Sequence, residues 1–364
     1  RTRARRDGRL VRHLLSALEY QFEHILRRTA LFPGRHVSVD MIVNPEAGAL
    51  SSEKRALATA EALNRLARGI VGPLRDDDEF SLRFHLTHYV GHAHEIARAL
   101  YARSVPDVHL IVSVGGDGTH GEVLSACEGS TSRAGAAKEL YFVRLPFGTG
   151  NDGADAPDLP SAVRLLLGSA EPRRTGQVVV SPREMQAFRA FNIASVGLDA
   201  YVGYLTNRLK GKFGGDLYKL IADVMTLLYE RIVGAGPMRV DILDEQGQSE
   251  RLERTFLLVA LGVSGYRRYG GGKLVLPAYE NLCAIEPLGV LGKIRLKGLF
   301  YRGEHVHEPN VTMRSVRKIV IHYGQAIPLQ MDGETVWLGR ENFPLEMQVG
   351  PPDTPILVFA QSKV

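Results

Sequence analysis

The chain has 364 residues and a formal net charge of +5, and about 45% of its residues are hydrophobic. This length exceeds what one hydrophobic core usually organises, so we expect two domains. The composition is typical of a folded globular protein and excludes a disordered or membrane-embedded chain. No run approaches the roughly 18 to 20 apolar residues that a transmembrane helix needs.

The two cysteines, Cys127 and Cys283, are isolated, so they form neither a disulfide framework nor a zinc-binding pattern. This cysteine usage favours a reducing, cytoplasmic setting. The mild positive charge suits an anionic membrane surface, a nucleotide or a nucleic acid. Nucleic-acid binding would require aromatic residues interleaved with a sustained basic face, which we do not find, so no nucleic-acid partner is expected.

Residues 1–34 are predicted to form a basic amphipathic helix ahead of the first domain. Apolar residues between Leu10 and Leu26 recur every three or four positions, and arginines flank the stripe. Such a helix can lie on a membrane surface, or pack on the body of the protein or on a second subunit. We favour packing, because amphipathic helices usually face a protein core.

Residues 35–174 alternate between strand and helix patterns, which indicates an α/β domain with a mostly parallel sheet. A helix N-terminus is predicted at Ser51 or Ser52, with Glu53 in the first turn. In chain order, strands are predicted at 37–43, 84–86, 108–114 and 139–145, and helices at 51–67 and 92–102.

Strand patterns dominate residues 175–364, which predicts a mostly antiparallel sheet or β-sandwich as a second domain. The last strand can return to the first domain. An exposed strand edge or the N-terminal helix could also form a homodimer. Strands are predicted at 177–180, 188–195, 238–243, 254–261, 293–300, 318–322, 327–331 and 356–360, and one helix at 216–231.

Three glycine-bearing turns directly follow three predicted strands of the first domain. Successive parallel strands end at the same edge of a sheet, where α/β proteins bind ligands, so the turns should meet there. The turns are Asn44-Pro45-Glu46-Ala47-Gly48, Gly115-Gly116-Asp117-Gly118-Thr119 and Pro146-Phe147-Gly148-Thr149-Gly150-Asn151-Asp152.

The residue types in these turns suit a phosphate site. Glycines let bare backbone N–H groups approach oxygens, and Thr119 and Thr149 carry hydroxyl donors. A helix after the second turn would direct its positive end at a phosphate. Asp117 adds a carboxylate for a proton or a magnesium ion. One such turn is usually an ordinary loop, whereas three in this order are much less expected by chance. The P-loop and dinucleotide-binding fingerprints are absent.

At these residues the sequence resembles the diacylglycerol kinase catalytic-domain family, which includes bacterial lipid kinases and sphingosine and ceramide kinases. The family carries turns of these three types, with a glutamate three residues after the second turn, here Glu122. The resemblance extends from about Val37 to the C-terminus. It continues at Phe191–Ala200, at Gly270-Gly271-Gly272 with Pro277-Ala278, and at Asp332-Gly333-Glu334.

The resemblance implies a three-layer α/β nucleotide-binding domain, a β-sandwich for the lipid substrate and an active site in the cleft between them. Asp117 and Glu334 are the implied base candidates; we lean toward Glu334 as base and Asp117 as the residue that helps hold Mg²⁺ on ATP, although Glu334 could hold the metal instead. The implied ATP-binding residues are Asn44, Pro45, Glu46, Ala47, Gly48, Thr87, Gly116, Asp117, Gly118, Thr119, Glu122, Gly148, Thr149, Asn151 and Asp152.

The chain departs from the family pattern in two places within the resemblance. His120 and Gly121 stand where the family usually has an apolar residue and an asparagine. Beyond Pro277-Ala278, only Glu280 keeps a carboxylate where the family often binds a structural magnesium, and Ala284 is among the residues that follow.

The expected activity is therefore ATP-dependent phosphorylation of a lipid hydroxyl, most simply that of a diacylglycerol-like lipid. The expected location is the cytoplasm, with peripheral attachment to a membrane surface. Two alternatives stay open: an NAD kinase-like enzyme that phosphorylates a small molecule, and a regulatory nucleotide-binding protein with impaired catalysis.

Overall fold

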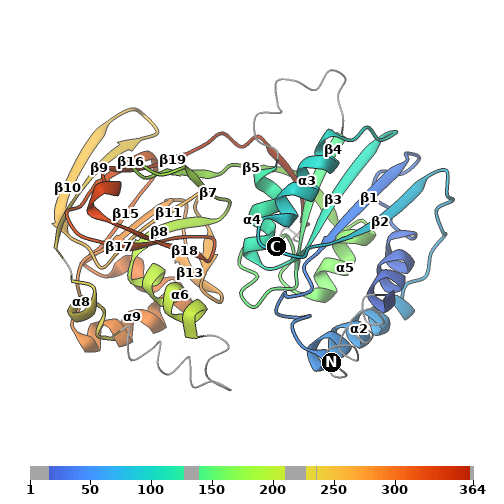
Figure 1. The fold of residues 1–364 in the computed structure, drawn as a ribbon, viewed down its shortest axis with the longest axis horizontal. Coiled ribbons are helices and arrows are strands. Elements are labelled where there is room, and N and C mark those ends of the chain that lie inside the picture. Colours follow the sequence, from blue (N-terminus) through green and yellow to red (C-terminus); the bar gives the residue numbers. More distant parts are fainter. Residues whose placement is uncertain (1–15, 127–138, 210–226, 235, 361–364) are drawn as a thin grey trace. The chain divides into compact units, whose positions relative to one another are not determined.

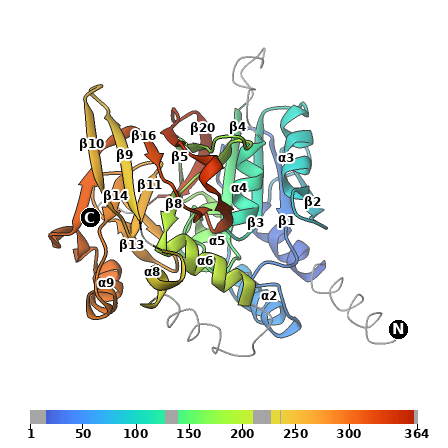
Figure 2. The same cartoon turned by 60° about the vertical axis from the view of Figure 1, so that its left-hand side comes forward.

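The computed structural model describes residues 16–126, 139–209, 227–234 and 236–360. The chain divides into two compact units. Unit 1 comprises Arg1–Arg174 together with Asp353–Val364, and unit 2 comprises Thr175–Pro352. Figures 1 and 2 show the α/β arrangement of unit 1 and the strand-rich arrangement of unit 2.

Unit 1 is built on a six-stranded sheet with the order β2-β1-β3-β4-β20-β5. β1 pairs in parallel with β2 and β3, and β4 pairs in parallel with β3 and β20. Every residue of β1 and β3 is buried, as expected for parallel strands covered on both faces. The strands are β1 (Val37–Val43), β2 (Phe80–Leu86), β3 (Val108–Gly115), β4 (Glu139–Pro146), β5 (Ala170–Thr175) and β20 (Thr354–Phe359).

Helices cover both faces of this sheet, which confirms the predicted three-layer α/β fold. The helix at 16–26, α2 (Glu53–Arg68) and α5 (Leu159–Leu167) share one hydrophobic core with the odd-numbered residues of β1. The opposite face carries α3 (His92–Ala102) and α4 (Asp117–Ser125) (Figure 2). The N-terminus of α2 is capped as predicted, because the Ser52 side chain accepts a hydrogen bond from the Arg55 N–H.

The described part of the N-terminal helix packs on unit 1, which confirms the interpretation that we favoured. Leu18 and Phe22 are 4% and 2% exposed, and Ile25 and Leu26 are fully buried. Their apolar stripe faces the core of the α/β unit, so these side chains are not available to enter a membrane. Residues 1–15 of the predicted helix lie outside the described residues.

Unit 2 is a sandwich of two six-stranded sheets, which confirms the predicted second architecture. The strand orders are β10-β9-β16-β19-β6-β7 and β15-β14-β11-β8-β17-β18. Strands from both sheets contribute to one hydrophobic core, for example Val240 and Ile319 from the first sheet and Val259 and Leu329 from the second. The first sheet contains β6 (Val178–Ser181), β7 (Phe188–Ala190), β9 (Pro237–Asp244), β10 (Ser249–Thr255), β16 (Val316–His322) and β19 (Leu345–Val349); the second contains β8 (Ile193–Gly197), β11 (Leu258–Gly262), β14 (Leu282–Ile285), β15 (Val311–Arg314), β17 (Ile327–Met331) and β18 (Glu334–Leu338).

Shorter elements complete unit 2, and β12 and β13 form a separate antiparallel pair. These elements are β12 (Arg267–Tyr269), β13 (Lys273–Leu276), α6 (Leu198–Leu209), α8 (Tyr229–Ile232), α9 (Val290–Arg302) and two 3₁₀ turns, Glu304–His307 and Arg340–Asn342.

One predicted strand is wrong, because residues 293–300 belong to the helix α9. Lys, Ile, Arg and Leu alternate at 293–296 and imitate a half-buried strand. The buried residues are instead Lys293, Leu296, Leu299 and Phe300, a spacing of three and four that fits one helix face. Gly303 ends α9 in the left-handed conformation, with φ of 72°.

Two other predicted strands are each divided. The 188–195 strand becomes β7 and β8, and the 254–261 strand becomes the end of β10 and β11. Most of the predicted helix at 216–231 lies outside the described residues, and only its end is seen, in α8.

A buried ionic cluster centred on Asp40 ties three strands and one helix together beneath α3. The carboxylate of Asp40 in β1 accepts hydrogen bonds of 2.8 Å from His85 Nε2 in β2 and His109 Nε2 in β3. Arg103, at the C-terminus of α3, donates from Nη1 at 2.8 Å. Burial alone would raise the pKa of Asp40, but hydrogen bonds from the two imidazoles and the charge of Arg103 hold it below its usual range.

We expect Asp40→Asn to lower the free energy of unfolding by about 3–5 kcal/mol, because Arg103 and two imidazoles lose a charged acceptor inside the protein. The exposed Asp76→Asn serves as the matched control and should be close to neutral. Denaturant titration measures both. Because the pKa of Asp40 is depressed in the folded state, its stabilisation is present above the unfolded pKa of about 4 and fades as pH falls below it. An equal stability gap between wild type and Asp40→Asn at pH 7 and at the acid end would contradict this assignment.

Candidate active site

The three glycine turns meet at the carboxyl edge of the unit 1 sheet, with their backbones in close contact. A Cβ atom on Gly148 would lie 2.4 Å from the Cα of Gly116, so the second and third turns touch without room for a side chain. A Cβ atom on Gly48 would lie 2.7 Å from Thr149 Oγ1, which brings the first turn against the third. Glycine is therefore required here for close approach of the backbones.

Side-chain and backbone hydrogen bonds connect the same turns. Asn44 Nδ2 donates to Thr119 Oγ1 at 2.9 Å, and Asn44 Oδ1 accepts from the Glu46 N–H at 2.9 Å. Phe147 donates its N–H to the Gly115 carbonyl at 3.1 Å and accepts from the Ala49 N–H at 2.8 Å. Three of these hydrogen bonds thus connect different turns, and the fourth closes the first turn.

The second turn is also the start of helix α4. Gly116 is the N-terminal cap and supplies no side-chain cap, and the first helical bond runs from the His120 N–H to the Gly116 carbonyl. The N–H groups of the first helical residues have no partner within the helix, and the helix dipole adds positive potential there. The helix therefore begins at Asp117, three residues earlier than the sequence predicted, with its positive end in the turn.

Asp117 lies between the second and third turns. Its Oδ1 accepts a hydrogen bond from the Gly153 N–H at 2.9 Å, and a Cβ atom on Gly150 would lie 3.2 Å from its Oδ2. Asn151 closes the third turn by accepting from the Gly148 N–H at 2.6 Å, and it adopts the left-handed φ of 54° that asparagine tolerates. A backbone N–H group therefore helps to orient the Asp117 carboxylate.

Sequence reasoning missed a buried ion pair that closes the third turn. Arg144, in β4, donates from Nη2 to Asp155 Oδ1 at 2.6 Å and from its backbone N–H to Asp155 Oδ2 at 2.6 Å. Both side chains are buried. Because the pair spans both ends of the turn, it fixes the base of the loop that carries Gly148. Arg144 lies in a strand whose other residues indicate only a structural role. A charged residue within such a buried strand was therefore the one sign in the sequence that it has a partner.

Two implied ATP-site residues have structural contacts of their own. Both carboxylate oxygens of Glu122 accept from the start of α3, from the Gly91 N–H at 2.9 Å and the Ala93 N–H at 3.2 Å. Thr87 is buried, and its N–H donates to the Val43 carbonyl at 3.0 Å. Among the other implied residues, Glu46 and Thr149 are exposed, Ala47 is buried, and Pro45, Gly118 and Asp152 are half-buried.

His120, one of the departures from the family pattern, points into the interior. Its Nδ1 lies 2.7 Å from Ser113 Oγ in β3, and its side chain is buried. Burial, aided by the positive charge of Arg144, lowers the pKa of His120 to about 3, so the imidazole is neutral at physiological pH. At the other departure, nothing lies within 4 Å of where a Cβ atom of Gly121 would be.

In unit 2, Glu334 follows a turn that is anchored by Asp332. The Asp332 carboxylate accepts hydrogen bonds from the Asn192 N–H at 3.0 Å and the Ile193 N–H at 2.9 Å, and a third from Phe191. Asp332 has a φ of 48°, a left-handed conformation that aspartate tolerates better than most residues. This anchor sets the start of β18, at which Glu334 is exposed.

A buried polar cluster lies beside this turn. Gln330 accepts from the Gly333 N–H at 3.2 Å and donates from Nε2 to Ser195 Oγ at 2.8 Å, and Ser195 donates to Asp199 Oδ2 at 2.5 Å. Burial raises the pKa of Asp199 to about 6, despite the hydrogen bonds from Ser195 and the Ala200 N–H. The resemblance at Phe191–Ala200 marked this segment, but it did not indicate that Asp199 would be a buried acid.

Within the described ranges, no group of three or more His, Cys, Asp or Glu side chains is arranged to hold a metal ion. The helices that the structure describes include none with the length and apolar character needed to span a membrane.

Comparison with known proteins finds similarity to lipid kinases. Residues 38–178 match the family model of the diacylglycerol kinase catalytic domain. The chain is 26% identical over 303 residues to the "Probable lipid kinase YegS-like" of Cronobacter sakazakii, covering 81% of this chain and 94% of that protein. It is 24% identical over 257 residues to the diacylglycerol kinase of Bacillus subtilis, covering 68% of this chain and 78% of that protein. The family resemblance predicted from the sequence is confirmed.

The fold is also similar to that of a solved structure, a diacylglycerol kinase from Bacillus anthracis. The TM-score is 0.51 at 16% sequence identity, and the match covers 90% of this chain and 98% of that chain. At this identity the likeness supports the fold alone.

We expect Gly148→Ala to destabilise unit 1, because the new methyl group must push the second and third turns apart. Overpacking of this kind costs about 1–3 kcal/mol. Gly121→Ala is the matched control, since the same methyl group meets nothing within 4 Å there and alanine favours the interior of α4. Thermal unfolding should show a lower Tm for Gly148→Ala and an unchanged or higher Tm for Gly121→Ala. Equal Tm values for the two variants would show that the turns are not in contact.

We expect Asp332→Ala to lower the free energy of unfolding by at least about 2 kcal/mol, because three backbone N–H groups lose a charged acceptor. Asp332→Asn keeps one acceptor oxygen and tolerates the left-handed φ, so its loss should be clearly smaller. Denaturant unfolding compares the two. If Asn and Ala cost the same, the hydrogen bonds to the Phe191–Ile193 segment contribute nothing to stability.

Proposed function

We propose that the chain is an ATP-dependent lipid kinase that transfers the γ-phosphoryl group to a lipid hydroxyl, with a diacylglycerol-like lipid as the simplest acceptor. The observation that carries this proposal is the contact of three glycine turns at the sheet edge where α4 begins. The names of the matched relatives and of the matched family model support a lipid as acceptor.

The nucleotide is bound mainly by backbone in this proposal. The turns present N–H groups beside glycines, and the N-terminus of α4 adds a positive potential, so both favour a polyphosphate. Thr119 accepts from Asn44 and keeps its own hydroxyl proton for donation. Side chains are excluded from the contact between Gly116 and Gly148, which keeps that backbone accessible to phosphate oxygens.

Two carboxylates carry the remaining chemistry. Asp117 accepts a hydrogen bond from the Gly153 N–H, and its carboxylate suits the residue that helps retain Mg²⁺ on the phosphates. Mg²⁺, when bound with ATP, neutralises charge that develops on the transferred phosphoryl group. Glu334 is exposed at the start of β18 and accepts the proton of the lipid hydroxyl as general base. The acceptor lipid is met at a cytoplasmic membrane surface, to which the protein attaches peripherally.

We expect labelled product from γ-labelled ATP, Mg²⁺ and mixed micelles that contain one acceptor lipid at a time: diacylglycerol, monoacylglycerol, ceramide, sphingosine or phosphatidylglycerol. Asp117→Asn and Glu334→Gln should each lower kcat by about 10²- to 10⁴-fold, the usual contribution of a positioned acid or base. Asp76→Asn and Glu245→Gln, both exposed and chemically matched, should keep full activity.

The other outcomes separate the alternatives. Product from NAD but from none of the lipids would favour a small-molecule kinase. ATP binding by calorimetry without any product would favour a regulatory nucleotide-binding protein. Full activity in both carboxylate variants would remove Asp117 and Glu334 from the mechanism.

A further inference from the structure

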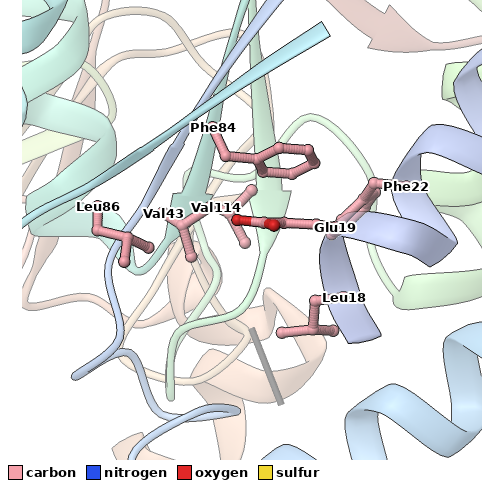
Figure 3. A pocket seen from close by; sticks show the side chains of 7 residues that line it. All are labelled: Leu18, Glu19, Phe22, Val43, Phe84, Leu86 and Val114. Atoms are coloured by element: carbon pink, nitrogen blue, oxygen red, sulfur yellow. The ribbon is translucent and has the colours of Figure 1, made fainter. Parts of the chain in front are cut away.

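The N-terminal helix at 16–26 lies beneath the ends of the strands from which the turns emerge. Figure 3 shows the side chains that line the space between this helix and the strands: Leu18, Glu19 and Phe22 from the helix, and Val43, Phe84, Leu86 and Val114 from the strands. Val43 and Val114 directly precede the first and second glycine turns, and Leu86 directly precedes Thr87. The space enclosed at this end of the helix is only about 10 Å³, which leaves room for no more than about one water molecule. A wider space of about 230 Å³ lies farther along the helix, beside Phe80 and Ser81 of β2.

Phe22 also contacts the third turn directly. Its ring centroid lies 6.1 Å from that of Phe147, with the planes inclined by 44°, and both side chains are almost fully buried. Phe147 is the residue whose backbone bonds to Gly115 and Ala49 join the three turns, and Gly148 follows it. The position of one aromatic ring in the helix is therefore transmitted to the backbone of all three turns.

The helix is fixed to unit 1 by contacts that do not involve the turns. Thr29 Oγ1 donates to the Leu166 carbonyl at 2.6 Å, and the Ala30 N–H donates to the Leu167 carbonyl at 2.8 Å. Arg75, itself buried, donates to the carbonyls of Thr29 and Arg35 at 3.1 and 2.8 Å. The segment that follows the helix is thus hydrogen-bonded to α5 and to the loop before β2, and these bonds fix the position of the helix beneath the turns.

This helix precedes the part of the chain that matches the family model, which begins at residue 38. The glycine turns are within that match. The support under them is an element that the matched region does not contain.

We infer that the helix at 16–26 is a positioning element of the nucleotide site, and that Phe22 is its positioning residue, acting through Phe147. The inference rests on the proposed function, since it assigns the turns to ATP. A packed interior transmits displacement because it contains few voids, so loss of the Phe22 ring lets Phe147 move and the turns separate. The backbone N–H groups of the turns then no longer point at the same phosphates. Affinity for ATP falls as a result, although no residue that contacts ATP has changed.

The test compares Phe22→Leu and Phe22→Ala with Phe80→Leu in the full chain. Phe80 is a buried phenylalanine of the same core but begins β2, at the opposite end of the strand from the turns. Calorimetry measures the Kd for MgATP, and steady-state kinetics separate KM for ATP from kcat. We expect Phe22→Ala to raise both Kd and KM by about 10- to 100-fold and to change kcat much less. Phe22→Leu should give an intermediate increase, and Phe80→Leu should lower Tm without changing Kd.

Hydrogen exchange of the ATP-free proteins gives a readout that does not depend on activity. Faster exchange in peptides that cover 44–50 and 144–153 of Phe22→Leu, but not of Phe80→Leu, supports the inference. Unchanged exchange in these peptides, or an unchanged Kd in a Phe22 variant with lowered Tm, would overturn it. If Phe22→Ala does not fold, Phe22→Leu alone decides.

The two proposals can fail separately. Wild-type protein that binds ATP but phosphorylates no lipid contradicts the lipid kinase and leaves the Kd comparison valid. Wild-type protein that binds no ATP removes the nucleotide site, and the inference about Phe22 falls with it.

Discussion

The contact between the backbones of Gly116 and Gly148 is the constraint on which the candidate site depends. Two strands, β3 and β4, end side by side in a parallel sheet, and the turns after them can touch only where neither carries a Cβ atom. Once they touch, the start of α4 and the third turn form one surface. The contact is supported from below by Phe147 and at the base of the loop by the Arg144–Asp155 pair.

The two units place their carboxylates by different physical means. Asp117 accepts a hydrogen bond from the Gly153 N–H at the carboxyl edge of a parallel sheet. Glu334 is placed by Asp332, which satisfies three N–H groups of the preceding segment and holds a left-handed turn. Asp117 is half-buried and Glu334 is exposed. In unit 2, the neighbouring Asp332 is the buried carboxylate.

Much of the α/β unit could be predicted from the sequence because its signals are local. β1 and α3 were predicted with their observed bounds, since a run of buried residues and a helical spacing each mark their own limits. α9 was not, because alternating Lys, Ile, Arg and Leu at 293–296 imitate a strand and only tertiary burial of Leu296, Leu299 and Phe300 decides the period. Likewise, the glycines in the sequence located the turns, whereas nothing in the sequence indicated that Arg144, Asp155 and Phe22 would contribute to the site. Their roles come from contacts between residues far apart in the sequence.

Polar atoms at the core of unit 1 show why burial alone does not mark a functional residue. Asp40 is more deeply buried than Asp117 and has a strongly depressed pKa, yet its oxygens are occupied by two imidazoles and a guanidinium within the layer between sheet and α3. A carboxylate saturated in this way stabilises strand register but has no lone pair left for a ligand. Asp117 at the turn edge differs because it is only half-buried and one of its oxygens accepts from the Gly153 N–H. Accessibility at the sheet edge, combined with orientation by main-chain groups, is the feature that separates the candidate site from the buried network below it.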